Sequence, residues 1–279
     1  MKTIVTHMSP DLDAIGSSWL VKKYMPGWDE APVTFVPAGK TLAGMKPDDD
    51  EDIIHVDTGL GRFDHHQLDD ENQCATRRVF DYLAEKNFIP KHDLDSLSRI
   101  VNFATKIDHF QEVFYTDPTA DVYDFSLNQL IEGLKGVIKN DAEVCRIGFQ
   151  LLDAELTVFK RKIRAEEELK EGLIFQTKWG KALAIESKND EIIKYAQKSG
   201  YVIVVRKDPK EGHIRIKSLP LKKIDLTPVY EQIKKIDKKA SWFFHISRHM
   251  LLNGSSKNPD SVPSALTLKR VVEIIKKIA

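Results

Sequence analysis

The 279-residue chain contains 42 Lys plus Arg and 42 Asp plus Glu, so it presents no overall positive field to a long nucleic acid duplex. Its 42% hydrophobic and 30% charged residues are typical of a globular protein, and its length predicts two domains. The sequence has no apolar run long enough to span a membrane and no secretion signal, so we expect a cytoplasmic protein without membrane contact.

Short β-rich segments alternate with helical patterns in the first half of the chain. Strands are predicted at Lys2–Thr6, Val33–Pro37 and Asp52–Val56. Apolar residues at helical spacing predict a helix after the first strand, and further helices at 75–86 and 94–108. This alternation predicts an α/β fold with a parallel, doubly wound sheet, in which ligands bind beyond the carboxyl ends of the strands.

The predicted secondary-structure pattern changes twice in the second half of the chain. The pattern is helical from residue 124 to residue 170, and short strands follow at 173–177, 181–186, 201–206, 213–217 and 242–246. Helices are predicted at 225–236 and 264–278. We therefore expect three parts: an α/β domain over 1–123, a helical connector over 124–172, and a smaller mixed α/β domain over 173–279.

A first group of candidate metal ligands follows the first predicted strand. His7, Asp11 and Asp13 lie on one strand-to-helix loop, which can direct an imidazole and two carboxylates to one point. Imidazole and carboxylate ligands without a thiolate suit Mn²⁺ or Mg²⁺ better than structural zinc. The segment is also a good helix N-cap with acidic residues that complement the helix dipole, so on its own it leaves both interpretations open.

A second group of candidate ligands follows the third predicted strand. Asp57 ends this strand, and Asp64, His65 and His66 follow in the same polar loop. Asp108, at the end of a helical segment, can also turn inward. One bridging carboxylate in such a set would hold two cations about 3.5 to 4 Å apart. The candidate ligands are His7, Asp11, Asp13, Asp57, His65 and Asp108.

Four segments resemble, in order, the successive motifs of the DHH phosphoesterase superfamily. They are HMSPDLDAIGSSW, VDTG, DHHQ followed by CATRRVFDYL, and KIDHF, and they cover roughly the first 110 residues. The superfamily includes RecJ nucleases, nano-RNases, manganese-dependent pyrophosphatases and the melanocyte-proliferating-gene-type hydrolases. The layout of this chain is most similar to the last of these.

The resemblance implies that 1–123 is a metal-binding catalytic domain and 173–279 a substrate-binding domain. It also implies a role for each candidate residue. His7, Asp11 and Asp57 would hold one metal, and Asp13, Asp57, His65 and Asp108 would hold the other, both metals being manganese, or magnesium or another divalent cation. Asp57 would then bridge the two. Asp64 would orient a neighbouring ligand, and His66 would contact the phosphate and take part in catalysis.

The last third of the chain resembles the superfamily less closely. In the segment FFHISRHMLLNGSS, Arg248 is a candidate for binding a phosphate and assisting catalysis, and the backbone amides of Asn253, Gly254 and Ser255 are candidates for an anion-binding nest. The alternative is an ordinary surface turn with no role in binding.

The resemblance implies hydrolysis of phosphodiester bonds in short single-stranded nucleic acids or nucleotides, by a hydroxide that bridges the two metals. Two alternatives stay open. One is a manganese-dependent inorganic pyrophosphatase, and the other is a metal-binding regulatory module that has lost turnover. The intact ligand set disfavours the regulatory module.

Overall fold

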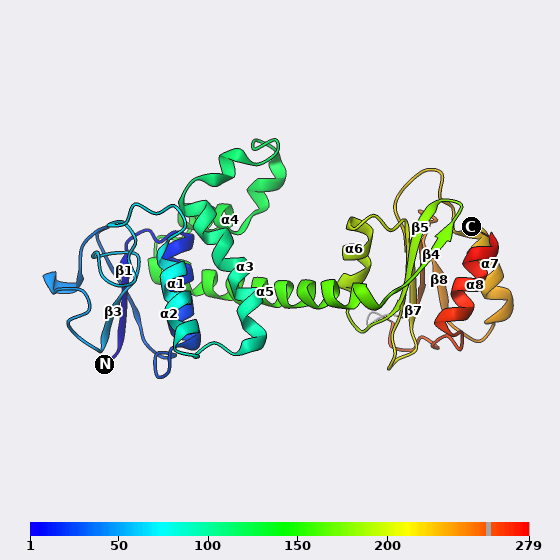
Figure 1. The fold of residues 1–279 in the computed structure, drawn as a ribbon, viewed down its shortest axis with the longest axis horizontal. Helices are drawn as coiled ribbons and strands as arrows, with labels where there is room; N and C mark the ends of the chain where they lie inside the picture. Colours follow the sequence, from blue (N-terminus) through cyan, green and yellow to red (C-terminus); the bar gives the residue numbers. More distant parts are fainter. Residues whose placement is uncertain (255–257, 279) are drawn as a thin grey trace. The chain divides into compact units, whose positions relative to one another are not determined.

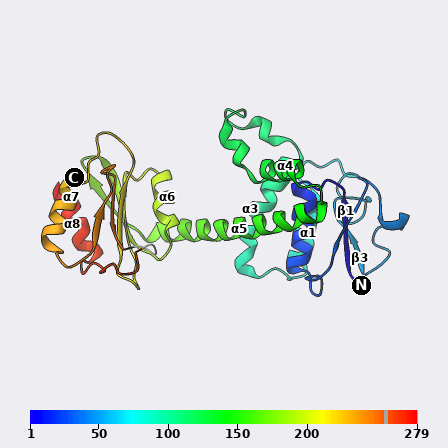
Figure 2. The same ribbon diagram turned by 180° about the vertical axis from the view of Figure 1, so that it is seen from behind.

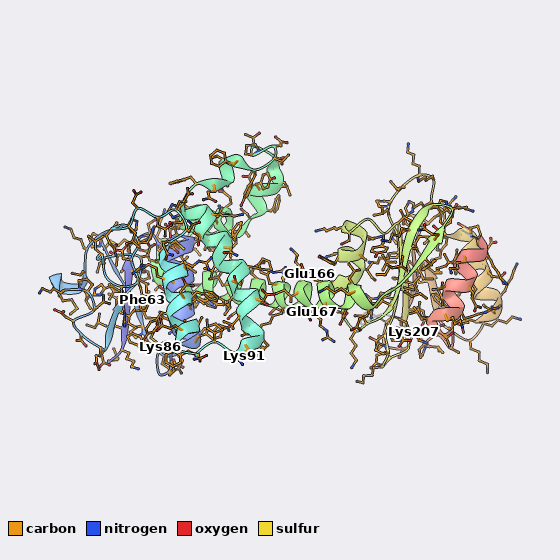
Figure 3. All side chains as sticks on the ribbon, in the orientation of Figure 1. Phe63, Lys86, Lys91, Glu166, Glu167 and Lys207 are labelled. Carbon is orange, nitrogen blue, oxygen red and sulfur yellow. The ribbon has the colours of Figure 1, made fainter. Side chains whose placement is uncertain are left out.

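The computed structural model describes residues 1–254 and 258–278. The chain forms two compact units, Met1–Lys160 and Arg161–Ala279, which are described separately below (Figure 1). The junction between them lies within one long helix, α5 (Asp141–Glu168), on which Glu166 and Glu167 are labelled in Figure 3. The three-part division predicted from the sequence stays a prediction.

A three-stranded parallel sheet organises the first unit. β1 (Thr3–His7) lies between β2 (Val33–Val36) and β3 (Ile53–His55), and Ile4 pairs with both Val33 and Ile54. α1 (Leu12–Tyr24) and α3 (Lys91–Asp108) lie on the same side of this sheet in both views (Figures 1 and 2). On the chain between β2 and β3, the Leu42 amide donates a hydrogen bond to Nε2 of His55.

The core of the first unit joins the sheet to its helices. α2 (Ala75–Glu85) packs against α1 and α3, and the core includes Ile4, Ile54 and Leu83. Phe63, labelled in Figure 3, is buried in this core with its ring edge-on to Tyr82, the ring centroids being 5.3 Å apart. Shorter elements complete the unit: η1 (Leu42–Gly44), η2 (Gln111–Phe114), η3 (Asp121–Phe125) and α4 (Leu127–Val137).

The second unit is built on a six-stranded mixed sheet of order β4-β5-β6-β7-β9-β8, in which only the β5–β6 pair is parallel. Alternate side chains of each strand point to opposite faces, so the sheet has two cores. Ala184 and Val205 pack with α7 and α8, whereas Leu183 and Val204 pack with α6. Accordingly, α6 and the α7–α8 pair lie on opposite sides of the sheet in Figure 1. The elements of this unit are η4 (Leu169–Glu171), β4 (Leu173–Thr177), β5 (Gly180–Glu186), α6 (Glu191–Lys198), β6 (Ile203–Lys207), β7 (Ile214–Ser218), α7 (Thr227–Ile236), β8 (Trp242–Phe244), β9 (Met250–Asn253) and α8 (Leu268–Ile278).

The α/β fold class predicted from the sequence is confirmed by the parallel first sheet and the mixed second sheet. The predicted strands begin and end within about two residues of those observed, and β4 matches at both ends. Among the described residues, the helix α6, the strand β9 and the short elements η1 and η2 were not predicted. Among the described residues, no helix is long and apolar enough to cross a membrane.

Candidate metal centre

The candidate ligands of the first unit lie at one edge of its sheet. His7 is the last residue of β1, and Asp57 follows the end of β3 by two residues. Because β1 and β3 are parallel neighbours, their carboxyl ends meet at the same edge. Asp11 at the N-cap of α1, Asp13 in the first turn of α1, and His65 in the loop after β3 lie at the same place.

Asp57 occupies the middle of this group. Its side chain is 3% exposed, and its backbone has a left-handed φ of 55°, a conformation that Asp adopts more readily than most residues. The Asp57 amide donates a hydrogen bond of 3.0 Å to the carbonyl of Phe63. The carboxylate Oδ2 lies 3.2 Å from Nε2 of His7, and Oδ1 lies 3.6 Å from Nε2 of His65. The two oxygens of Asp57 therefore face two different groups of ligands.

The first group consists of His7, Asp11 and Asp57, whose ligand atoms lie within 4.8 Å of one another. Nδ1 of His7 is 2.8 Å from the carbonyl oxygen of Met8, to which it can donate, so Nε2 is left to bind a cation. Asp11 is the N-cap of α1, and its Oδ1 accepts from the amides of Asp13 and Ala14. Its Oδ2 faces His7 at 3.9 Å, so helix capping and metal binding are compatible at this residue.

The second group surrounds His65, whose Nε2 lies 3.4 Å from Oδ2 of Asp108 and 3.7 Å from Oδ2 of Asp13. Asp108 is the last residue of α3. The carboxylate of Asp13 is oriented by the first turn of α2, because it accepts hydrogen bonds of 2.7 and 2.8 Å from the amides of Ala75 and Thr76. Each oxygen keeps a further lone pair for a cation.

Asp64 and His66 form a separate pair beside these ligands. Oδ1 of Asp64 accepts from the backbone amide of His66 and lies 2.7 Å from its ring Nδ1, while Oδ2 accepts from the Leu60 amide. Burial alone would raise the pKa of Asp64, but the hydrogen bonds from His66 and Leu60 hold it below its usual value. A charged Asp64 thus fixes the orientation of His66, whose side chain is 59% exposed.

The electrostatics of the group reflect four carboxylates in a confined space. Burial and the charge of Asp57 raise the pKa of Asp13 to about 6, and burial and the charge of Asp13 raise the pKa of Asp108 to about 8. Burial opposes the protonation of His7 and His65, yet the neighbouring carboxylates, Asp57 foremost, raise the pKa of each to about 9. Divalent cations would relieve the same repulsion that these protons relieve.

Three buried atoms show that this donor set fits cations. Oδ1 of Asp57, Nε2 of His65 and Oδ2 of Asp108 have no hydrogen-bond partner among the described residues. Buried polar atoms are rarely left unpaired in folded proteins, and all three are predicted ligand atoms. Cys74 and Cys145 are buried free thiols, and neither joins the clusters of potential ligands found among the described residues.

His109 is a further candidate ligand that the predicted set did not include. It forms a possible three-ligand cluster with His65 and Asp108, and His66 forms another with Asp57 and His65. His109 Nε2 also lies 2.7 Å from the carbonyl oxygen of Gln73. Its position directly after Asp108 was the available signal, because the two residues share the end of α3.

The predicted substrate residues of the last third belong to the second unit. The side chain of Arg248 is 65% exposed and pairs with Asp225 at 3.1 Å. Arg248 lines a cavity of about 580 Å³ together with Lys178, Trp179 and Phe244. The side chain of Asn253 is buried, donates to the carbonyls of Ser241 and Val262, and accepts from the amide of Ser264.

The predicted anion-binding nest lies only partly within the described residues. Gly254 has a left-handed φ of 78°, and a Cβ at this position would collide with the ring of His213. Ser255 lies outside the described residues. The binding roles of Arg248, Asn253, Gly254 and Ser255 stay predictions.

No family model and no curated protein matches the sequence. Among solved structures, the chain is similar to an uncharacterized protein from Helicobacter pylori, with 12% identity and a TM-score of 0.27 over 100% of this chain and 99% of that one. RecJ from Thermus thermophilus, in complex with Mg²⁺, is 12% identical, with a TM-score of 0.33 over 99% of this chain and 49% of that one. A DHH domain from a member of the s1p family of ribosomal proteins is 10% identical, with a TM-score of 0.33 over 99% and 86% of the two chains.

Because all three TM-scores lie below 0.5, the chemistry of the site rests on its own geometry.

Proposed function

We propose that this chain is a two-metal phosphoesterase of the DHH type that hydrolyses phosphodiester bonds in short single-stranded nucleic acids or nucleotides. The observation that supports this most strongly is the position of Asp57, whose two oxygens face separate groups of imidazole and carboxylate ligands. His7 and Asp11 would complete one metal site, and Asp13, His65 and Asp108 the other. Oxygen and imidazole donors suit Mn²⁺ or Mg²⁺.

The residues around the metals have distinct tasks in this proposal. When bound, a pair of divalent cations activates water and stabilises charge on phosphoryl oxygens. The buried carboxylates of Asp13 and Asp57 hold their ligand oxygens rigidly, because backbone hydrogen bonds fix Asp13 and the left-handed turn fixes Asp57. Asp64 orients His66, which is exposed enough to reach a bound phosphate.

Hydrolysis and metal content of an Asp57→Asn variant test the proposal. Asn tolerates the left-handed backbone but removes the bridging charge, so we expect loss of at least one metal equivalent and a fall in hydrolysis of at least about a thousand-fold. Asp69→Asn, which changes an exposed carboxylate of the same loop, should match the wild type.

The substrates for this comparison are short single strands, dinucleotides and pyrophosphate, each with Mn²⁺ or Mg²⁺. Near-normal turnover by Asp57→Asn would contradict the proposed site. Turnover of pyrophosphate alone would instead favour an inorganic pyrophosphatase.

A further inference from the structure

The cavity beside the metal centre extends beyond the proposed ligands. It has a volume of about 550 Å³ and lies within the first unit. Its lining includes the candidate site residues Asp11, Asp13, His65, His66 and Asp108. It also includes Phe110, Glu112 and three residues of α4, a set that is called the far wall below. Within the described part of the chain, no Lys or Arg lines this cavity. Lys135 lies next to this lining but is paired with Glu132, so a second phosphate group placed against the far wall would meet no unpaired positive side chain of the lining.

Phe110 places an aromatic ring on the far wall. Its side chain is 74% exposed, although burial of an aromatic ring is strongly favourable in water. The residue has a left-handed φ of 54°, and its amide donates to the carbonyl of Ile107 at the end of α3. Phe110 follows Asp108 by two residues, so their Cα atoms lie within about 7 Å of each other. This separation suits a base and the phosphate of the same nucleotide.

The polar groups of the far wall favour a neutral partner that donates hydrogen bonds. Oε2 of Glu112 is buried and has no hydrogen-bond partner among the described residues. The other residues of this wall are Asn128, Gln129 and Glu132. The carboxylate of Glu132 pairs with Lys135 at 2.7 Å, whereas Oε2 of Glu112 has no such partner among the described residues. A carboxylate repels phosphate, whereas it accepts hydrogen bonds from the amino and ring N–H groups of a base.

We propose that this far wall is a nucleobase subsite, in which a base stacks on Phe110 and donates hydrogen bonds to Glu112. The proposal rests on the proposed function, because the phosphate attached to that nucleotide lies at the metal ligands. It narrows the substrate class to nucleotides and disfavours pyrophosphate. Guanine fits best, since its N1–H and 2-amino groups form a double donor edge, whereas uracil offers a single N–H.

The test compares Phe110→Ala with Phe114→Ala. Phe114 belongs to the adjacent η2 and is 84% exposed, but it does not line the cavity. The probes are 5′-phosphorylated dinucleotides of guanine, adenine and uracil, and a dinucleotide whose corresponding position lacks a base. Affinity is measured by calorimetry with Mg²⁺ present, and turnover is measured separately.

We expect Phe110→Ala to weaken binding of the guanine dinucleotide by about 10- to 100-fold, as loss of one stacked base does, while Phe110→Trp retains it. The base-free probe should be insensitive to Phe110→Ala, and Phe114→Ala should match the wild type. Glu112→Gln should reduce the preference for guanine over uracil. Equal binding of base-bearing and base-free probes by wild type would overturn the subsite even if hydrolysis is found.

If the chain is not a phosphoesterase but the subsite exists, the experiment gives a result that differs from the one that overturns the subsite. In that case no phosphoester is hydrolysed, yet Phe110→Ala still weakens dinucleotide binding and the subsite stands. Sedimentation of both variants tests the alternative that the exposed rings form an interface between two copies of the chain. If Phe110→Ala and Phe114→Ala both dissociate an oligomer and lower activity equally, the exposed rings serve self-association and the subsite is wrong.

Discussion

At Asp57, a left-handed backbone turn directs one buried carboxylate toward two imidazoles, His7 and His65. Asp64 acts on a neighbour rather than on a metal, because its hydrogen bonds go to His66 and Leu60. In the proposed site these contacts separate the tasks of the loop after β3: Asp57 and His65 would bind metal, Asp64 would position His66, and His66 would contact the substrate.

The separation of tasks predicts different kinetic effects for His66→Ala and Arg248→Ala. Both variants should bind two metals. His66→Ala should mainly lower kcat, by about 100-fold or more, because this residue lies beside the reacting phosphate. Arg248→Ala should mainly raise KM if the arginine holds a phosphate equally in the ground and transition states.

Steady-state kinetics on a dinucleotide measures both effects, with Arg270→Ala as a control that removes another exposed arginine of the second unit. An Arg248→Ala enzyme that equals the wild type on every substrate would show that Arg248 belongs only to a surface turn.

At the scale of elements, the close approach of α1 and α2 sets the position of the Asp13 carboxylate. Gly16 of α1 faces Thr76 of α2, and a Cβ at Gly16 would lie 2.7 Å from Oγ1 of Thr76. Thr76 is buried, and its hydroxyl donates to the carbonyl of Asp13. The two helices can therefore approach this closely only with glycine at residue 16.

Gly16→Ala should destabilise the protein by about 1 to 3 kcal/mol, because the added methyl displaces a buried side chain. The matched change Gly136→Ala in α4 meets open space and should stabilise by up to about 1 kcal/mol through helix propensity. Urea unfolding measures both changes. Equal effects of the two substitutions would contradict the close packing of α1 and α2.

The strands and the ligand-bearing loops could be predicted from the sequence because their signals are local. Apolar runs predicted the strands, and the polar residues at the ends of these runs predicted His7 and Asp57 as candidate ligands. β9 was missed because it has only four residues and pairs with β7, which lies more than thirty residues earlier in the chain, as well as with the preceding β8. The cavity wall at Phe110 was also missed, since an aromatic residue at a helix end resembles a core position. Only the fold shows that its ring is exposed beside the ligands.

At the scale of the whole molecule, the proposed metal ligands couple folding to pH. His7 has a pKa of about 9 in the folded chain and loses its proton near 6.5 when unfolded, and His65 behaves in the same way. Asp108, with its pKa raised to about 8, also binds its proton more tightly when folded. Between a pH of about 6.5 and about 9 the folded chain therefore binds more protons than the unfolded chain, so raising the pH lowers the free energy of unfolding.

Metal-free protein should therefore lose thermal stability as the pH is raised from about 6.5 to 9. Added Mn²⁺ should stabilise it more at the upper end of this range, because protons compete with metal for the same atoms. Thermal unfolding with EDTA and with Mn²⁺ measures both trends. A pH-independent midpoint without metal would show that the histidines are not held by Asp57.

The most direct test of the central claim is anomalous diffraction from crystals grown with Mn²⁺. The proposed centre predicts two manganese peaks about 3.5 to 4 Å apart, each next to a different carboxylate oxygen of Asp57. His7 and Asp11 should bind one ion, and Asp13, His65 and Asp108 the other. A single ion, or ions bound away from Asp57, would contradict the two-metal centre.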